Sequence, residues 1–401
     1  MNKIASYLIL LPIFFNRIFV GQMGGEYEDW TILSLNNLSY LSHFLMIFIW
    51  LYSKNKKKLL KINYLKFLFP VFFLIIIESF QLIYLSSVFD STDTLFLIIY
   101  FFRVIIILFS YCIYFNFFYE RSSFINALLN FTKISIFFSL IFLINNFIFE
   151  SSFQVHISQG VSRIQGFLSE PSAFAAPLSI FFIFSLIKKN YLLSLISLFC
   201  IYYTHSLSAL GTLIFALLLF LSNQKIKGFL IYAISITTIV IFISSYYVYS
   251  EEFTSINRVL NIFQNISLYD INSDNLRQFD LDRFWGLLLT FETLIDSNLF
   301  FHGLGLNGSS YILFKMYGEV IDFGIIAYLI SSFGVILGSI FLIFLIKNSL
   351  RIYFYDKEIG YVLLIFLFSV LFNSAGGIVV YLLPLTMGIF PQIFKVKKIK
   401  V

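Results

Sequence analysis

The chain has 401 residues, of which 59% are hydrophobic and only 12% are charged, whereas a soluble domain carries about 25% charged residues. This composition excludes a soluble globular protein. The formal net charge of +6 does not indicate nucleic-acid binding, because the basic residues form short clusters between apolar stretches, which is the pattern that membrane topology sets.

Apolar stretches of membrane-spanning length recur along the chain. The first, residues 4–20, is long and lacks a small-residue cleavage site after it, so it predicts a retained span rather than a signal peptide. Further stretches approach or exceed the ~20 apolar residues that cross ~30 Å of hydrocarbon, namely 67–88, 95–118, 229–247 and 324–346. Residues 191–203 and 361–373 are shorter and need flanking residues to cross.

Lys and Arg are concentrated in every second loop, as expected of cytoplasmic loops. These basic clusters are Lys3; residues 54–66; Arg121 and Lys133; Lys188 and Lys189; Lys225 and Lys227; Lys347, Arg351 and Lys357; and residues 395–400. The alternation predicts an all-α polytopic membrane protein with about twelve transmembrane helices. The predicted protein is a single integral membrane domain over residues 1–401, with both termini in the cytoplasm.

One extracytoplasmic loop, residues 250–322, is far longer than the others and carries ten of the 21 acidic residues. Two stretches in it, residues 283–294 and 311–322, predict short helices outside the bilayer, because capping residues precede both. A glycine-rich turn, residues 302–308, lies between them. Long ordered loops are usually functional, so this loop is a candidate part of a site.

Basic residues outside the cytoplasmic clusters are mostly Arg. They are Arg17, Arg103, Arg163, Arg258, Arg277, Arg283 and Lys315. Arg offers a rigid, permanently charged fork that binds phosphate oxygens, so an Arg-rich outer face suits a diphosphate ligand. Salt bridges to nearby acids explain any single one of them equally well, and Arg103, within a span, could pair with Glu78.

The sharpest local pattern comprises residues 163–172, immediately before the span that begins near Ala173. Pro171 fits the first turn of a helix, and Gly166 permits a close approach of the backbone to a ligand. The outward helix N-terminus favours an anion, and Glu170 could accept a proton from a hydroxyl. A capped helix with an ion pair between Arg163 and Glu170 is the equally weighted alternative.

Two residues of the long loop are further catalytic candidates, whereas the sequence does not favour a metal site. Asp322 stands where the chain enters the membrane, a costly place for a carboxylate unless it is paired or functional. His302 adjoins Gly303 and Gly305 in the glycine-rich turn. The four histidines show no ligand spacing, so we expect neither a metal nor another cofactor.

These features together resemble the O-antigen or capsular polysaccharide polymerases of the Wzy type, over about residues 163–328. The residues that carry the resemblance are Arg163-x-x-Gly166-Phe167-x-x-Glu170-Pro171-Ser172, Ser206-x-Ser208-x-x-Gly211, Arg283, Gly303-x-Gly305 and Asp322-Phe-Gly324. Related O-antigen ligases share the later elements. An Arg-x10-Gly spacing described for some polymerases is missing after Arg163 and Arg283, so a model of paired catch-and-release loops is not carried over.

The resemblance implies glycosyl transfer between undecaprenyl-diphosphate-linked glycans at the periplasmic face of the bacterial inner membrane, with membrane lipid around the chain. It also implies a chain-length regulator as a possible partner, no nucleic acid and no nucleotide cofactor. Two alternatives stay open: an O-antigen ligase that transfers glycan to lipid A-core, and a polysaccharide flippase. The long outer loop with Arg and acidic residues favours an enzyme over the flippase.

Overall fold

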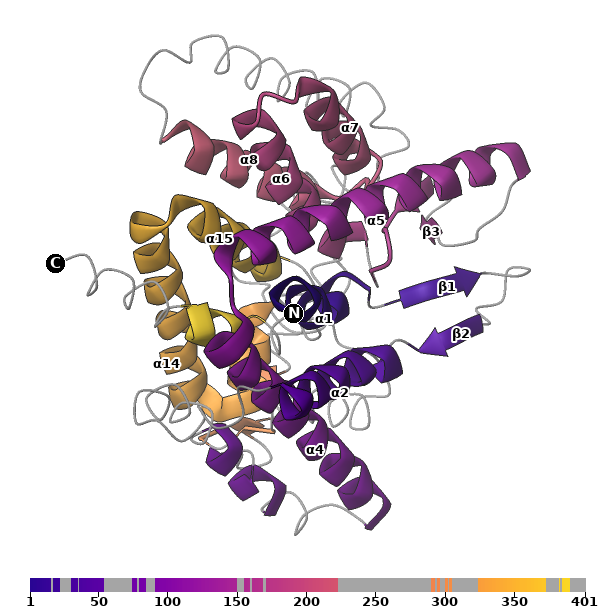
Figure 1. Ribbon diagram of the computed structural model, residues 1–401. Helices are drawn as coiled ribbons and strands as arrows, with labels where there is room; N and C mark the ends of the chain where they lie inside the picture. Colours follow the sequence, from indigo (N-terminus) through magenta and orange to yellow (C-terminus); the bar gives the residue numbers. More distant parts are fainter. Residues whose placement is uncertain are drawn as a thin grey trace, which may run out of the picture.

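The computed structural model has an all-α fold, as the sequence predicts, with two short antiparallel hairpins (Figure 1). It describes residues 1–15, 17–21, 30–34, 36–53, 74–77, 79–83, 91–149, 155–158, 161–168, 171–222, 290–292, 294–295, 300–301, 303–304, 324–372, 382 and 384–389. The predicted span 229–247 and the predicted helix 311–322 lie outside these residues. The predicted helix 283–294 is described only near its end.

The elements follow one another in chain order from α1 to α15. They are α1 (Asn2–Phe14), β1 (Arg17–Gly21), β2 (Trp30–Ser34), α2 (Asn36–Tyr52), α4 (Ser91–Ile113), the π-helical turn η2 (Tyr114–Phe118), α5 (Arg121–Phe149), β3 (Val155–Ser158), β4 (Val161–Ile164), α6 (Pro171–Ile187), α7 (Tyr191–Tyr202), α8 (Leu207–Leu221), α14 (Ile325–Tyr355) and α15 (Lys357–Phe372). Each hairpin pairs neighbouring strands, β1 with β2 and β3 with β4.

Among the described residues, three helical stretches are long and apolar enough to cross a membrane. They are Phe101–Phe118, Arg121–Phe149 and Ile325–Tyr355. Helices α6, α7 and α8 are apolar but shorter, as the sequence predicts for residues 191–203. Several apolar side chains of α5, among them Phe137 and Phe147, are more than half exposed, which suits contact with lipid rather than water. The chain is therefore a helical membrane protein.

The first helix is shorter than the predicted span over residues 4–20. Helix α1 contains Pro12, which lacks an amide hydrogen, and the helix ends at Phe14. The chain then pairs as β1 with β2, with Arg17 opposite Ser34. The prediction of one continuous span is wrong beyond Phe14, because hydropathy does not distinguish apolar residues of a strand from those of a helix.

Helix α14 is broken at Gly334, within the stretch 324–346 that the sequence predicts as one span. Gly334 has φ 75° and ψ 170°, a conformation outside the helical region. A Cβ atom at Gly338 would lie 2.5 Å from the carbonyl oxygen of Leu329. Residues nine apart in a straight helix are about 13 Å apart along its axis, so the part before Gly334 folds back on the part after it. The later part still has about 21 residues, enough to span.

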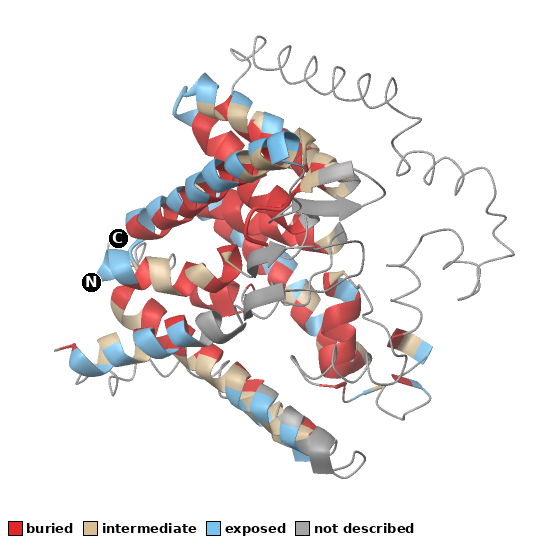
Figure 2. Cartoon of the chain, turned by 90° about the vertical axis from the view of Figure 1, so that its right-hand side faces the viewer, coloured by how far each residue is buried: buried red, intermediate tan, exposed pale blue. Residues whose placement is uncertain are grey.

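Helix packing places α1 at the centre of the molecule. In Figure 1, α1 lies between α5 and α2, and contacts both. Helix α6 packs against α7 and α8, and α15 packs against α14, α6 and α8. Buried residues, red in Figure 2, concentrate where these helices meet. The largest fully buried side chains include Tyr111, Tyr114 and Phe174.

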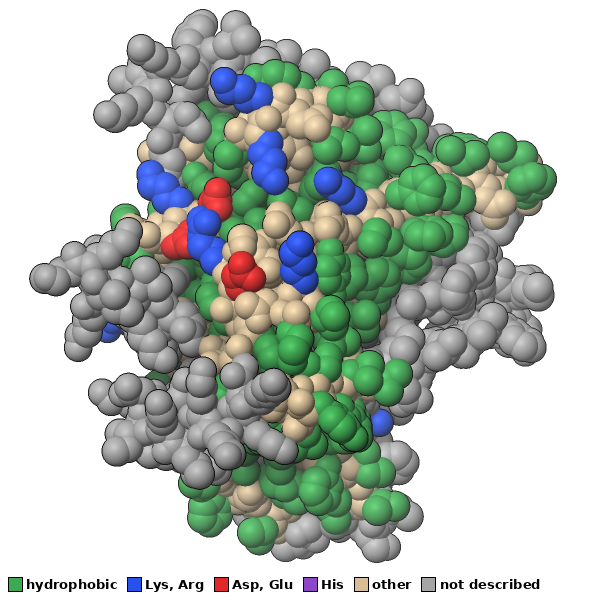
Figure 3. All heavy atoms as spheres, viewed as in Figure 1, with side chains coloured by type: hydrophobic (Ala, Val, Ile, Leu, Met, Phe, Trp, Pro, Cys, Tyr) green, Lys and Arg blue, Asp and Glu red, His purple; other side chains and the backbone are tan. Residues whose placement is uncertain are grey.

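The helices have two distinct ends. The basic end comprises the start of α1 with Lys3, the junction of α4 with α5 at Arg121, the turn after α6 with Lys188, and the junction of α14 with α15 at Lys357. In Figure 3, Lys and Arg side chains gather with Asp and Glu on one face. The hairpin end comprises both hairpins, the start of α6 and the turn between α7 and α8.

An ion-pair cluster joins separate helices at the basic end. The guanidinium of Arg121, at the start of α5, donates from Nη2 to Asp356 at 3.0 Å and to Glu358 at 2.6 Å. Asn2, at the start of α1, donates to Glu120 at 3.4 Å. Three predicted cytoplasmic segments are thereby brought together.

We expect Gly360→Ala to destabilise the fold. Gly360 lets α15 approach the end of α14 so closely that an added methyl group would meet the backbone of Tyr353 and lie 2.6 Å from its Cβ atom. Overpacking of this kind costs about 1–3 kcal/mol. Thermal unfolding of the purified protein should therefore shift to lower temperature.

Gly211→Ala is the matched control, since nothing lies within 4 Å of a methyl group added to Gly211 in α8. Replacing a helical glycine by alanine should leave the unfolding temperature unchanged or raise it. Equal unfolding temperatures for the two variants would contradict the close packing of α14 and α15.

Candidate functional site

Four of the predicted site residues lie in the part of the chain that the structure describes. They are Arg103, Arg163, Gly166 and Gly303. The others lie outside the described residues: the catalytic candidates Glu170, Asp322 and His302, and the binding candidates Arg258, Arg277, Arg283 and Gly305. Arg163 and Gly166 both lie at the hairpin end, where they define the Arg163 site.

Arg163 is held between a hairpin and the turn that follows α7. It belongs to β4, opposite His156 of β3, and this hairpin packs against α5. The amide of the next residue, Ile164, donates to the carbonyl oxygen of Tyr203 at 2.9 Å. The guanidinium of Arg163 donates from Nε to the carbonyl oxygen of Thr204, also at 2.9 Å. This hydrogen bond uses one of the five N–H donors of the half-buried side chain.

Gly166 turns the chain tightly between β4 and α6. Its φ of +64° lies in the left-handed region, and a Cβ atom there would come within 3.2 Å of the Phe174 ring. The next residue, Phe167, is buried, and its ring stacks on Phe15 with the ring centroids 5.0 Å apart. The close approach that the sequence assigns to a ligand is thus made, in this structure, to the first turn of α6.

Helix α6 begins at Pro171, which confirms the predicted helix start. Proline suits the first helical position, because the amide hydrogen it lacks would have no partner within the helix. Ala173 and Phe174 are buried, which fixes the start of α6 beside Gly166. The N-terminus of α6 therefore lies at the hairpin end, next to the segment that carries Arg163.

His205 is a site residue that the sequence analysis did not select. It lies between α7 and α8 with φ 45°, a left-handed conformation that is uncommon for any residue except glycine. Its ring lies 5.6 Å from that of Tyr202 and 5.8 Å from that of Tyr203. Burial, together with the nearby charge of Arg163, lowers the pKa of His205 to about 4. The imidazole is therefore neutral at physiological pH.

The serine motif lies directly after His205. The hydroxyl groups of Ser206 and Ser208 are 2.8 Å apart, and α8 begins at Leu207 between them. Because Tyr203 and Thr204 bind the segment 163–164, the structure brings the two motifs 163–172 and 206–211 to one place. They are about 40 residues apart in the chain. Two elements of the resemblance thus share one site.

Arg103 and Gly303 lie elsewhere. Arg103 is half-buried in α4, which packs against α2 and lies below α1 in Figure 1, whereas α6, α7 and α8 lie above it. Gly303 packs against the break in α14, where a Cβ atom would meet the backbone of Gly334 and Ser332. The structure therefore does not bring Arg103 to the Arg163 site, and it gives Gly303 a packing role.

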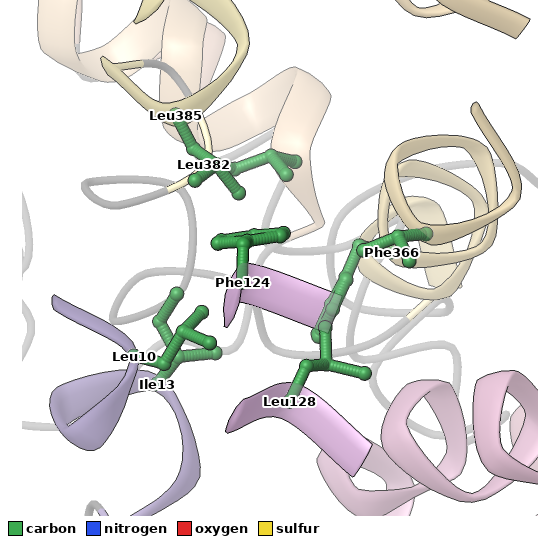
Figure 4. Close-up of a pocket in the computed structure, with 8 residues that line it drawn as sticks. Leu10, Ile13, Phe124, Leu128, Phe366, Leu382 and Leu385 are labelled. Atoms are coloured by element: carbon green, nitrogen blue, oxygen red, sulfur yellow. The ribbon is translucent and has the colours of Figure 1, made fainter. Parts of the chain in front are cut away.

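An apolar pocket lies away from this site, towards the core (Figure 4). It is lined by Leu10 and Ile13 of α1, Phe124 and Leu128 of α5, Val362 and Phe366 of α15, and Leu382 and Leu385. Since every lining side chain is a hydrocarbon, the pocket offers no hydrogen bond to a glycan and no charge to a phosphate. It is a packing feature of the helical core.

Metal ligands and reactive thiols are not gathered in the described residues. No group of three His, Cys, Asp or Glu there is placed to hold a metal ion. The two cysteines, Cys112 and Cys200, are buried and free.

Comparison of the chain with protein-family models, curated proteins and solved structures finds no significant match.

We expect His205 to make the folded protein less stable in acid. Its pKa is about 4 in the folded state and about 6.5 in an exposed state. The stabilisation due to its neutral form is therefore complete above pH 6.5 and is lost as the pH falls from 6.5 towards 4. The unfolding temperature of the purified protein, measured from pH 7.5 to 4.5, should fall less in His205→Asn, since Asn tolerates the same backbone conformation.

An identical loss of stability with falling pH in His205→Asn and the unaltered protein would contradict this role. His43→Asn provides a comparison at a buried histidine outside the site, where Nδ1 of the ring lies 2.6 Å from the hydroxyl oxygen of Ser110. That variant tests whether any buried histidine gives the same acid response.

Proposed function

We propose that the protein is a polysaccharide polymerase that joins undecaprenyl-diphosphate-linked repeat units by glycosyl transfer at the periplasmic face of the bacterial inner membrane. The observation that carries the proposal is the position of Arg163. Its guanidinium is fixed by Thr204 at the hairpin end, where the two motifs of the resemblance meet. An oriented, permanently charged Arg beside an α-helix N-terminus is suited to a diphosphate.

The reaction breaks the bond between the anomeric carbon of the donor glycan and its diphosphate. A hydroxyl of the acceptor repeat unit forms the new glycosidic bond and loses its proton to a base, while the diphosphate leaves with the electron pair of the broken bond. Arg163 would stabilise the negative charge that develops on the diphosphate. Glu170 or Asp322 would accept the proton, as the sequence predicts, with Arg258, Arg277 and Arg283 as further phosphate ligands in the long loop.

The membrane topology belongs to the same proposal. We take the basic end as cytoplasmic, following the distribution of Lys and Arg, and the hairpin end as periplasmic. The chain would then cross the membrane about twelve times, with loop 250–322 at the periplasmic face. Lipid tails of both substrates would remain in the bilayer while their diphosphates reach the Arg163 site from the side.

We expect Arg163→Lys to fail although it keeps the positive charge. Lysine cannot make the planar, bidentate contact with phosphate, nor donate from a guanidinium Nε to Thr204. Polymer formation by the purified protein from undecaprenyl-diphosphate-linked repeat units should fall by about a hundredfold or more, a loss typical for one transition-state donor. Gel electrophoresis of the glycan ladder measures it.

Arg351→Lys is the matched control, because Arg351 is exposed near the basic end. It should polymerise at the rate of the unaltered protein. Polymerisation at full rate by Arg163→Lys would refute the phosphate assignment, provided both variants show the unfolding temperature of the unaltered protein.

Deletion of the gene distinguishes a polymerase from the two alternatives, a ligase and a flippase. Loss of a polymerase should leave single repeat units attached at the cell surface, because export and attachment continue. Loss of a ligase would leave no glycan attached, and loss of a flippase would trap the units inside the cell. Either of the latter two phenotypes would replace the proposed function.

A further inference from the structure

The break in α14 is filled by the segment 300–304, which lies between the two predicted helices of the long loop. The amide of Leu304 donates to the carbonyl oxygen of Ser331 at 2.6 Å, and the amide of Val335 donates to the carbonyl oxygen of Phe300 at 2.9 Å. Both bonds join backbone groups on either side of Gly334. The segment 300–304 therefore supplies partners for peptide groups that a continuous helix would have paired internally.

A side chain from a distant helical segment completes the same junction. Gln81 lies in residues 79–83, within the predicted span 67–88, and is 4% exposed. Its amide nitrogen donates to the carbonyl oxygen of Ser332 at 2.7 Å, across 251 residues of sequence. The carbonyl oxygens of Ser331 and Ser332 are thus bound by two different parts of the chain. These two bonds join the break in α14 to residues 79–83 and to the segment 300–304.

Glycine is required on both sides of the junction. Gly303 has φ +70° and Gly334 has φ +75°. A Cβ atom at Gly303 would lie 2.5 Å from the carbonyl group of Ser332 and would also meet the backbone of Gly334. Any larger residue at position 303 would push the segment away from α14. The two glycines therefore allow backbone-to-backbone contact at the break.

The next attachment of the long loop is also close-packed. Gly324, where the chain leaves the loop and enters α14, lies against α15, and a Cβ atom there would be 2.7 Å from the carbonyl oxygen of Leu371. Position 302 directly precedes one attachment, and position 322 is two residues before the other. Two of the three catalytic candidates, His302 and Asp322, are therefore adjacent in sequence to backbone that α14 and α15 hold.

We propose that Gln81, Gly303 and Gly334 form an anchor that positions the segment 300–304 of the long periplasmic loop for glycosyl transfer. The inference rests on the proposed function and deepens it by adding positioning residues in three separate segments. Gln81 does not touch substrate in this scheme. It binds the Ser332 carbonyl, which keeps the break open for segment 300–304.

The test uses Gln81→Met, which conserves the volume of the side chain but removes the donor. Amide hydrogen exchange of the full chain in lipid nanodiscs should become at least about fivefold faster in peptides that cover residues 300–304 and 331–335, because the anchor opens more often. Polymerisation of undecaprenyl-diphosphate-linked repeat units should show a kcat reduced by about tenfold with little change in KM, as expected when orientation rather than binding is lost.

Asn116→Leu is the matched control. It also removes a side-chain amide, but this amide donates within its own helical segment, to the backbone carbonyl oxygen of Cys112 at 2.9 Å. It should leave exchange at 300–304 and 331–335 unchanged. Unchanged exchange in Gln81→Met would overturn the anchor. Faster exchange with normal kcat would overturn its role in positioning. If the unaltered protein forms no polymer, the proposed function fails, while the exchange result still decides whether the anchor exists.

Discussion

The structure depends on one constraint, which is that peptide groups within a membrane must find partners inside the protein. Helices satisfy this constraint by themselves, whereas helix ends and breaks require donors from elsewhere. The described chain meets the requirement in the same way at two places. Arg163 donates to the carbonyl oxygen of Thr204 after α7, and Gln81 donates to that of Ser332 at the break in α14. Each bond fixes an irregular segment against a distant one.

These irregular segments also carry the residues on which the proposed function rests. The turn after α7 joins the motif 163–172 to the motif 206–211, and the break in α14 receives the segment 300–304 of the long loop. Left-handed backbone at Gly166, His205 and Gly303 lets the segments approach closely. In a chain with few charged residues, polar donors that stabilise the backbone are placed where they could also meet a charged substrate. The structural and the proposed functional roles of Arg163 are therefore compatible.

The sequence predicts much of the fold because hydropathy and charge are local properties. It places the helical stretch 95–118, the short helix at 191–203 and the start of α6 at Pro171 correctly, and the structure confirms each. It also selects Arg163 and Gly166, which lie three residues apart at the hairpin end. It misses His205 because nothing in one histidine between two apolar stretches reveals a left-handed turn or a neighbouring guanidinium.

The sequence by itself therefore determines that this is an all-α membrane protein whose basic segments alternate along the chain. Only the tertiary structure decides where helices stop within apolar stretches, as at Phe14 and Gly334, since an apolar residue is equally well buried in a helix, a strand or a bend. The tertiary structure also decides the role of Gly303, which packs against α14, and it reveals that of Gln81. Both depend on contacts between residues far apart in sequence, which no local pattern encodes.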